Sequence, residues 1–245
     1  MALHFLIEDA AGSGPGDVVR LTGAEAHHAA AVRRVRVGES VTVGDGRGAW
    51  LTGTIAAASP KEVAVEIDSR TDTQAASPRT VLVQALAKGD RDELAVQAAT
   101  ELGVDAIVPW QAARSVSRWE GAKVAKGVAR WESIAREAAK QAHRPWLADL
   151  EQPVTTRELA VRASGRRMLV LEPTASVALS RVVIDPTDTS DVILVVGPEG
   201  GISPEELDAL QAAGATLVRL GDTVLRTSTA GPAALAVVNA TLGRW

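Results

Sequence analysis

The sequence predicts an α/β protein with two domains: a small β-rich domain at the amino terminus and a larger one built on a mostly parallel sheet. Up to about residue 72, short apolar segments alternate with turns, and residues 62–68 alternate apolar and polar side chains as a half-buried strand does. From about residue 78, strand-like and helix-like segments alternate along the chain. Such alternation is typical of a parallel sheet covered by helices on both faces.

The first domain is predicted from a hairpin and bounded by a linker. Val41–Val43 and Ala49–Ile55 flank a turn rich in Gly and Asp, which is the pattern of two antiparallel strands. Ala24–Val35 is expected to form one helix. Residues 70–79 are polar and small and include a proline, as linkers often are. We therefore expect one domain at residues 1–72 and another at residues 78–245.

The second domain contains five candidate strands and two well-signalled helices. A helix at Pro204–Ala213 should begin with Ser203 as its N-cap, and Glu206, three residues later, completes the spacing of a capping box. A helix at Asp90–Leu102 begins with the same spacing. The candidate strands are Thr80–Ala87, Ala106–Trp110, Arg167–Leu171, Val192–Val196 and Thr216–Leu220.

Composition excludes several classes of protein. The chain has 245 residues, 46% hydrophobic and 23% charged, and no apolar run long enough for a membrane helix, so we expect no membrane partner. Residues 1–9 lack the basic and apolar blocks of a signal peptide. The absence of cysteine excludes disulfides and thiolate catalysis, and it favours a cytoplasmic location.

Charge is unevenly distributed along the chain. The net charge is −4, yet residues 112–144 carry eight basic and three acidic side chains, a local balance of +5. This pattern suits either a solvated helix face or a surface that contacts nucleic-acid phosphates, and both interpretations stay open at this stage. The basic residues are Arg114, Arg118, Lys123, Lys126, Arg130, Arg136, Lys140 and Arg144.

A glycine-rich segment follows the fourth candidate strand. Gly197-Pro198-Glu199-Gly200-Gly201 lies between this strand and the capped helix, where open α/β sheets bind ligands. Glycines let backbone groups approach a ligand without a Cβ in the way. The spacing matches neither a dinucleotide fingerprint nor a phosphate-binding P-loop. The segment is either a ligand loop or a plain tight turn.

A second candidate segment follows the fifth strand. Leu220-Gly221 is a turn, and a helix is expected to start soon after it, with Ser228 or Thr229 as N-cap. Arg226 lies at this junction between strand and helix. It could contact a ligand, or it could pair with a nearby acid and stabilise the turn.

Together these two segments resemble the carboxyl-terminal motifs of the SPOUT methyltransferases, and more narrowly those of the 16S ribosomal RNA uridine-N3 methyltransferases. The stretches Gln84–Asp90, Gln97–Val104 and Arg130–Gln141 are also similar to that family, and His28–Gly38 resembles its amino-terminal segment. The resemblance covers nearly the whole chain. It implies a SPOUT-type parallel sheet with a carboxyl-terminal trefoil knot, preceded by a PUA-like β barrel. One departure is Ser228, where the family usually has an acid.

The resemblance implies transfer of a methyl group from S-adenosylmethionine to N3 of uracil. Arg226 and Arg114 are the candidates for orienting the substrate and stabilising the anion that forms on its oxygens. Glu199 could act as the base, or it could bind the cofactor or a backbone turn. No metal is expected, because His27 and His28 are adjacent on a helix and point to different sides. The expected cofactor-binding residues are Leu171, Glu172, Gly197, Pro198, Gly200, Gly201, Leu220, Gly221, Leu225 and Thr227.

The expected partners are 16S ribosomal RNA, in the assembled small subunit, and a second copy of the chain. N3 lies on the Watson–Crick edge, so the base must be unpaired or extruded when it reacts. The residues expected to contact RNA are Arg33, Arg34, Arg36, Arg130 and Arg144. Two alternatives stay open: a SPOUT enzyme that methylates a ribose 2′-hydroxyl of another RNA, and an RNA-binding assembly factor without catalysis.

Overall fold

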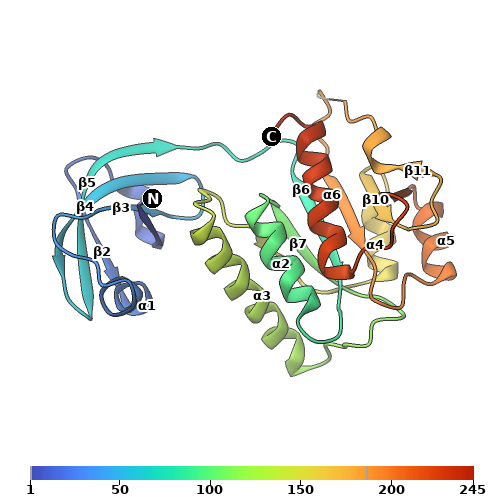
Figure 1. The fold of residues 1–245 in the computed structure, drawn as a ribbon, viewed down its shortest axis with the longest axis horizontal. Helices are drawn as coiled ribbons and strands as arrows, with labels where there is room; N and C mark the ends of the chain where they lie inside the picture. The colour runs from blue at the N-terminus through green and yellow to red at the C-terminus, as the bar shows by residue number, and fades with distance from the viewer. Residues whose placement is uncertain (1, 186) are drawn as a thin grey trace. The chain divides into compact units, whose positions relative to one another are not determined.

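The computed structural model describes residues 2–185 and 187–245, which form two compact units (Figure 1). The first unit comprises Met1–Ala75 together with Ala139–Leu147, and the second comprises Ala76–Ala138 and Ala148–Trp245. Within the described residues, no helix is both long enough and apolar enough to cross a membrane.

The first unit contains a five-stranded sheet in the order β1-β3-β4-β5-β2. The first pair, β1 and β3, is parallel, and the remaining pairs are antiparallel. The predicted hairpin is confirmed, since β3 and β4 pair across the turn at residues 45–48. The strands are β1 (Leu3–Leu6), β2 (Val18–Thr22), β3 (Ser40–Gly44), β4 (Ala49–Ala58) and β5 (Glu62–Asp72).

The helix predicted at residues 24–35 is present but shorter. Helical residues run without a break from Gly23 to Val32, as α1 (Gly23–His27) followed by the π-type turn η2 (His28–Val32). The helix ends because Arg34 adopts a left-handed conformation with φ of 55°, and the Val35 N–H then bonds to the carbonyl of Ala29 at 3.1 Å. This closure is the usual C-terminal stop of a helix. A further short helix, η1 (Glu8–Gly12), follows β1.

Buried polar side chains tie residues 139–147 to the sheet of the first unit. The Lys140 ammonium lies 2.9 Å from a carboxylate oxygen of Glu25; the lysine side chain is buried and the glutamate side chain is 13% exposed. His4 stacks on Trp50 with ring centroids 4.1 Å apart, and His143 lies tilted beside both rings. The Thr42 hydroxyl donates to the Leu3 carbonyl and therefore accepts from Nδ1–H of His4 at 3.0 Å. Burial and the charges of His143 and Lys140 lower the pKa of His4 to about 3.

The second unit is built on one sheet in which all recorded strand pairs are parallel. The order is β11-β13-β10-β12-β6-β7-β8, and β9 also pairs with β7. All five predicted strands are confirmed within two residues. They are β6 (Thr80–Ala85), β7 (Ala106–Gln111), β10 (Arg167–Leu171), β12 (Val192–Val196) and β13 (Thr216–Arg219), and the sequence did not predict the short β8 (Asp149–Leu150), β9 (Val154–Thr155) and β11 (Val177–Ala178).

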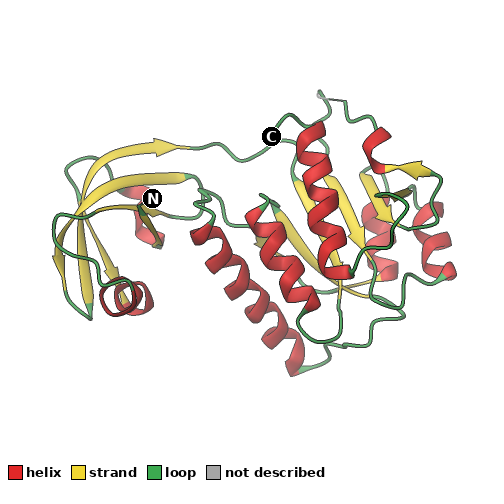
Figure 2. Cartoon of the chain, viewed as in Figure 1, coloured by secondary structure: helices red, strands yellow, loops and turns green. Residues whose placement is uncertain are grey.

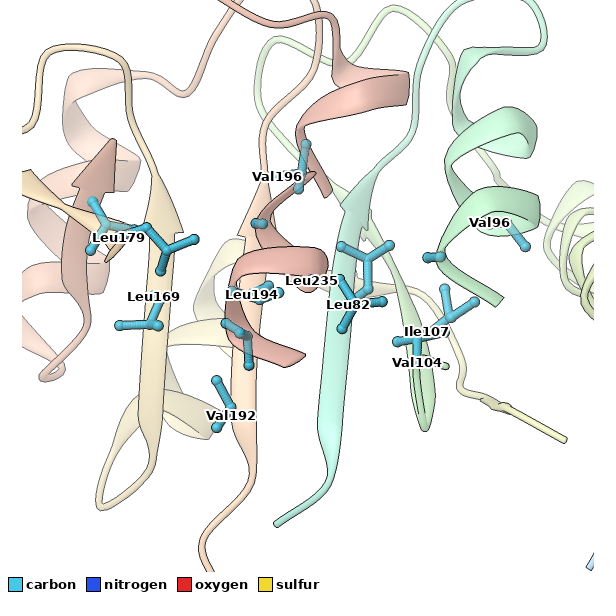
Figure 3. Packing of buried hydrophobic residues seen from close by; sticks show 14 of the residues in the cluster. Leu82, Val96, Val104, Ile107, Leu169, Leu179, Val192, Leu194, Val196 and Leu235 are labelled. Atoms are coloured by element: carbon cyan, nitrogen blue, oxygen red, sulfur yellow. The ribbon is translucent and has the colours of Figure 1, made fainter. Parts of the chain in front are cut away.

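Helices cover both faces of this sheet, as the alternating pattern predicts (Figure 2). One face packs on α2 (Arg91–Glu101), α3 (Ala122–Gln141) and α6 (Thr227–Thr241). The other packs on α4 (Thr156–Ala163) and α5 (Pro204–Ala212). Figure 3 shows the first core, in which Leu82, Leu169 and Leu194 project from neighbouring strands and Leu235 comes from α6. The short helix η3 (Leu179–Arg181) also contributes to this core.

The structure corrects two of the predicted helix caps. The capping box of α5 is present, with Ser203 accepting from the backbone of Glu206. The box predicted at Asp90 is absent, because the side chain of Glu93 binds Arg130 instead. The N-cap of α6 is Arg226 rather than Ser228 or Thr229, since Thr227 is already helical.

The trefoil knot depends on how the chain threads its own loops, and it stays a prediction of the resemblance.

The buried His4 gives the first unit a pH-dependent stability. Its unfolded pKa is near 6.5 and its folded pKa is about 3, so below pH 6.5 the unfolded chain binds a proton that the folded chain does not. Stability is therefore lost as the pH falls from 6.5 towards 3, by about 2 kcal/mol between pH 7 and pH 5.

His4→Phe keeps a ring against Trp50 and should remove this dependence. Urea unfolding at pH 7 and pH 5, followed by circular dichroism, would measure it. The variant is expected to lose about 2 kcal/mol less than the wild type over this interval. Equal losses in the two proteins would mean that His4 titrates normally in the folded chain.

Candidate functional site

A cavity of about 380 Å³ lies at the carboxyl ends of β10, β12 and β13. Its volume falls within the range of small-molecule sites, and its position is where parallel sheets bind ligands. Three connections line it, after β10, after β12 and between β13 and α6. Both glycine-rich segments singled out in the sequence are therefore brought to one place.

The loop after β12 owes its shape to its glycines. A Cβ on Gly197 would lie 2.6 Å from Cγ1 of Ile202, whose side chain is buried beneath the loop. Gly201 has a φ of 72°, a conformation that side chains with a Cβ rarely adopt, and its N–H donates to the carbonyl of Pro198 at 2.9 Å. This geometry closes the loop tightly before Ser203 caps α5.

Glu206 ties this loop to the connection after β7. Its side chain is buried, and one oxygen accepts from the backbone N–H of Ala113 at 2.8 Å and from the hydroxyl of Thr156 at 2.6 Å. The other oxygen accepts from the N–H of Ser203 at 3.1 Å. One carboxylate therefore holds the starts of α4 and α5 and the end of β7 in register.

A buried chain of hydrogen bonds joins the two glycine-rich segments. Gln84, which is fully buried in β6, donates from its amide nitrogen to the Thr227 hydroxyl at 2.8 Å. The same hydroxyl donates to the carbonyl of Gly197 at 2.8 Å. Thr227 is the first residue of α6, so the chain links the central strand, the start of the last helix and the loop after β12.

Glu199 is held by the connection between β6 and α2. One of its oxygens accepts from the backbone N–H of Lys88 at 2.9 Å and from the Arg91 guanidinium at 3.0 Å. Burial works to raise its pKa, but the N–H groups of Glu199 and Lys88 and the Arg91 charge outweigh it, so the pKa of Glu199 lies below its usual value. The carboxylate is charged at neutral pH and already engaged.

Arg226 lines the cavity with an exposed side chain. Among residues 2–185 and 187–245, no acid pairs with its guanidinium and no carbonyl accepts from it. The alternative in which Arg226 pairs with a nearby acid is therefore absent from the structure. The two other cations that line the cavity are engaged: Arg91 pairs with Glu199, and Arg219 donates to the carbonyl of Ala175 at 3.0 Å.

Most of the expected site residues line this cavity, and two do not. Gly200 and Arg114 lie outside the lining and contact each other, since Arg114 donates to the Gly200 carbonyl at 3.1 Å. A Cβ on Gly200 would lie 3.3 Å from Cβ of Arg114, so the glycine allows this close approach. The expected residues that line the cavity are Leu171, Glu172, Gly197, Pro198, Glu199, Gly201, Leu220, Gly221, Leu225, Arg226 and Thr227.

Sequence reasoning missed several lining residues. Arg91 was overlooked because nothing local shows that the start of α2 reaches the loop after β12. The others lie within or beside the segments already singled out, where proximity along the chain was the available signal. They are Pro173, Val196, Ile202, Val218, Arg219, Thr223, Val224 and Ala230.

The cavity walls suit an adenosine-type ligand. Five apolar side chains provide a slot for a flat base. Glu172 accepts from the N–H and hydroxyl of Thr174 with one oxygen, at 3.1 and 2.8 Å, which leaves its other oxygen to accept from a ribose hydroxyl. A Cβ placed on Gly221 would have no protein atom within 4 Å, so the space beside this glycine is open. These five are Leu171, Val196, Val218, Leu220 and Leu225, and Ile202, Val224, Ala230 and two prolines add to the apolar lining.

The residues expected to contact RNA differ in their surroundings. Arg33, Arg34 and Arg36 are exposed on the turn after η2 in the first unit. Arg130 is also exposed, but it bonds Glu93 with two nitrogens at 3.1 and 2.8 Å. Arg144 is half-buried. Their contacts with RNA stay predictions.

In the described part of the chain, no group of three or more His, Asp or Glu side chains could hold a metal ion.

Two domain families match this chain. The RNA methyltransferase domain matches residues 75–239, and the RNA methyltransferase PUA domain matches residues 21–68. Ribosomal RNA small subunit methyltransferase E of Mycobacterium tuberculosis is 42% identical over 236 residues, 94% of this chain and 89% of that protein. The protein of the same name from Bacillus subtilis is 30% identical over 226 residues, 89% and 88% of the two chains.

Solved structures with a bound cofactor are similar over almost the whole chain. Ribosomal RNA small subunit methyltransferase E of Neisseria gonorrhoeae, bound to S-adenosylmethionine, has a TM-score of 0.86 and 28% identity and covers 98% of both chains. A protein from Legionella pneumophila, also with bound S-adenosylmethionine, has a TM-score of 0.84 and 32% identity. It covers 98% of this chain and 96% of its own.

The Thr227 hydroxyl should be necessary to hold the loops that line the cavity in place. Thr227→Val keeps the shape of the side chain but removes the hydroxyl, which leaves buried groups of Gln84 and Gly197 without this partner, at a cost of about 1–3 kcal/mol. We expect the affinity for S-adenosylmethionine, measured by calorimetry, to fall about tenfold. Thr229→Val, an exposed threonine of the same helix, is the matched control. Equal affinities in both variants would show that the loops do not depend on this hydrogen bond.

Proposed function

This chain belongs to the RNA methyltransferase family that includes ribosomal RNA small subunit methyltransferase E, and we propose that it methylates N3 of a uridine in 16S ribosomal RNA with S-adenosylmethionine as methyl donor. One observation carries the choice of catalytic group. The cavity that suits the cofactor has an unpaired cation, Arg226, in its lining, whereas Arg91 and Arg219 are already engaged.

Arg226 would act on the acceptor base. When bound, S-adenosylmethionine supplies an electrophilic methyl group on a sulfonium. N3 of uracil carries a proton that passes to solvent water, and negative charge develops on the neighbouring oxygens as this proton leaves. A guanidinium that no protein acid neutralises can stabilise this charge, and it need not break a salt bridge to do so. Its place at the start of α6 also lets it orient the base for in-line transfer.

Glu199 would position the site and would not remove the proton. A base must have a pKa near the working pH, and the pKa of Glu199 is lowered by the groups that hold it. Its contacts with Lys88 and Arg91 join the loop after β12 to the start of α2. We therefore assign it to fixing the cofactor loop.

The remaining partners follow from the chemistry of the substrate. A folded ribosomal RNA must present the uridine unpaired, and the assembled small subunit is the proposed form of the substrate. Arg33, Arg34 and Arg36 of the first unit would bind its phosphates. The enzyme would act in the cytoplasm, where small subunits are present.

A homodimer is part of this proposal. Val224 lies in a loop that lines the cavity and is 78% exposed, so a second copy of the chain would cover an apolar side chain next to the site. Sedimentation velocity should then detect a species of about twice 25.5 kDa. A single species of 25.5 kDa at micromolar concentration would remove the dimer from the proposal.

The test of the function is methyl transfer from radiolabelled S-adenosylmethionine to small subunits that lack their native modifications, followed by mass spectrometry of the nucleosides. One new 3-methyluridine is the expected product. Label on a ribose or in transfer RNA would favour a different SPOUT methyltransferase. Tight binding to the subunit without transfer would favour an assembly factor.

Arg226→Ala should lower the rate of transfer about 10²–10³-fold, because it removes a donor aimed at developing charge. The fold and the affinity for S-adenosylmethionine should change little, since the side chain is exposed and unpaired. Arg166→Ala is the matched control, because Arg166 is exposed and directly precedes β10, at the amino end of the strand, whereas the cavity lies at the carboxyl end. Full activity of Arg226→Ala would remove this residue from the mechanism.

Glu199→Gln separates the two roles of Glu199. The amide still accepts from the Lys88 N–H, so kcat should stay within about tenfold of the wild type, and the pH profile should keep its shape. A general base would instead show a decrease of about 10²–10⁴-fold. Glu205→Gln, which removes an exposed acid in the first turn of α5, is the control.

A further inference from the structure

The second unit has another cavity, of about 400 Å³, outside the site described above. It lies between the connection after β6, the connection after β7 and the first half of α3. No residue lines both cavities. The sequence analysis named its basic residues Arg118, Lys123 and Lys126 only as part of the +5 segment, whereas it expected Arg130 to contact RNA.

Three cations that line this cavity are exposed and unpaired: Arg118, Lys123 and Lys126. None of them has an acid or carbonyl partner among the residues that the structure describes. The two acids of the lining are occupied. Asp92 is buried and accepts from the backbone N–H groups of Ala87 and Glu93 at 3.1 and 2.9 Å. Glu93 is neutralised by the bidentate contact with Arg130.

The wall that carries Arg118 is held in place. A Cβ on Gly127 would lie 2.4 Å from the ring of Trp119, so the indole packs directly on α3 at this glycine. Trp119 also meets Trp131 edge to face, with centroids 5.2 Å apart. The side chain of Gln111 accepts from the backbone N–H of Trp119 at 3.2 Å and donates to the carbonyl of Ser117 at 3.3 Å. The connection is therefore preorganised, which lowers the entropic cost of binding an anion there.

One short connection borders both cavities. Ala87 and Gly89 line the second cavity, and Arg91 lines the first. Between them, the backbone N–H of Lys88 binds Glu199. A strand of RNA whose target base enters the first cavity would therefore pass close to the second.

We propose that the second cavity is a phosphate subsite for the RNA strand next to the target uridine, in which Arg118, Lys123 and Lys126 bind backbone phosphodiester groups. The inference rests on the proposed function for its choice of RNA as the ligand. The paired Arg130, which the sequence analysis expected to contact RNA directly, keeps Glu93 from repelling the phosphates. The subsite carries affinity and positions the strand, and no base is read there.

The test is a double variant, Arg118→Ala with Lys126→Ala. Its binding to unmodified small subunits is measured between 50 and 200 mM salt, without cofactor. The dissociation constant should rise at least tenfold at 100 mM salt. The slope of log K against log salt should become shallower by about 1.4, because each single-strand phosphate that the protein neutralises contributes about 0.7 and two cations are removed. Calorimetry should give an unchanged affinity for S-adenosylmethionine.

The control is Arg157→Ala with Arg166→Ala, which removes two exposed cations from α4 and from the turn before β10, neither of which pairs with an acid of the described residues. This pair should bind subunits as the wild type does. In steady-state methyl transfer, the Arg118/Lys126 variant should raise KM for the subunit and leave kcat unchanged. Equal binding and an equal salt slope in the two double variants would overturn the subsite.

The two proposals fail in different ways. If the wild type transfers no methyl group but the Arg118/Lys126 variant still binds subunits more weakly and with a shallower salt slope, the subsite stands and the methyltransferase proposal falls. If the wild type forms 3-methyluridine and the variant binds subunits like its control, the function stands and the subsite falls.

Discussion

The site depends on one buried chain of hydrogen bonds, from Gln84 through the Thr227 hydroxyl to the carbonyl of Gly197. Gln84 and Thr227 are 143 residues apart in sequence, so no local propensity could hold them together. Buried hydrogen bonds of this kind favour one arrangement, because a donor or acceptor that loses its partner away from water is costly. Glu206 does the same at the neighbouring edge, where it binds Ala113, Thr156 and Ser203. With both in place, the loops around the cavity need little ordering when a ligand binds.

The cations of this protein fall into two groups: those paired with acids, which hold segments in place, and those without an acidic partner, which are available to bind ligands. Lys140 is buried against Glu25, Arg130 holds Glu93, and Arg91 holds Glu199. These pairs fix segments in place, and their charges are largely neutralised. Arg226 in the first cavity has no such partner among the described residues, and the same is true of three of the four cations that line the second, Arg118, Lys123 and Lys126. The positive charge of an exposed cation without an acidic partner is not neutralised within the protein, so it can attract an anionic ligand. Both cavities therefore favour anionic groups such as phosphates and a developing uracil anion.

The segment at residues 139–147 belongs to the first unit although it begins with the last residues of α3, whose residues 122–138 belong to the second. Its Lys140 and His143 lie beside Glu25, His4 and Trp50. The cluster places charged and titratable groups where a small sheet would otherwise bury apolar side chains. Burial lowers the pKa of His4 to about 3, so the stability of this unit decreases as the pH falls below 6.5.

The sequence by itself determined the fold class, the five main strands, the capped helix α5 and the two glycine-rich segments that meet at the cavity. These are local features, set by the period of apolar residues, by Ser and Pro at a helix start and by glycines at strand ends. It also pointed to the family, through motifs spread over the whole chain. Only the tertiary structure decided which charges are paired. Arg91 reaches Glu199, Arg114 reaches Gly200, and Arg226 reaches no acid among the described residues, because such contacts depend on the positions of strands distant in sequence. The N-cap of α6 also depends on a contact outside the helix, because Thr227 is already helical and its hydroxyl bonds to the carbonyl of Gly197 in the loop after β12.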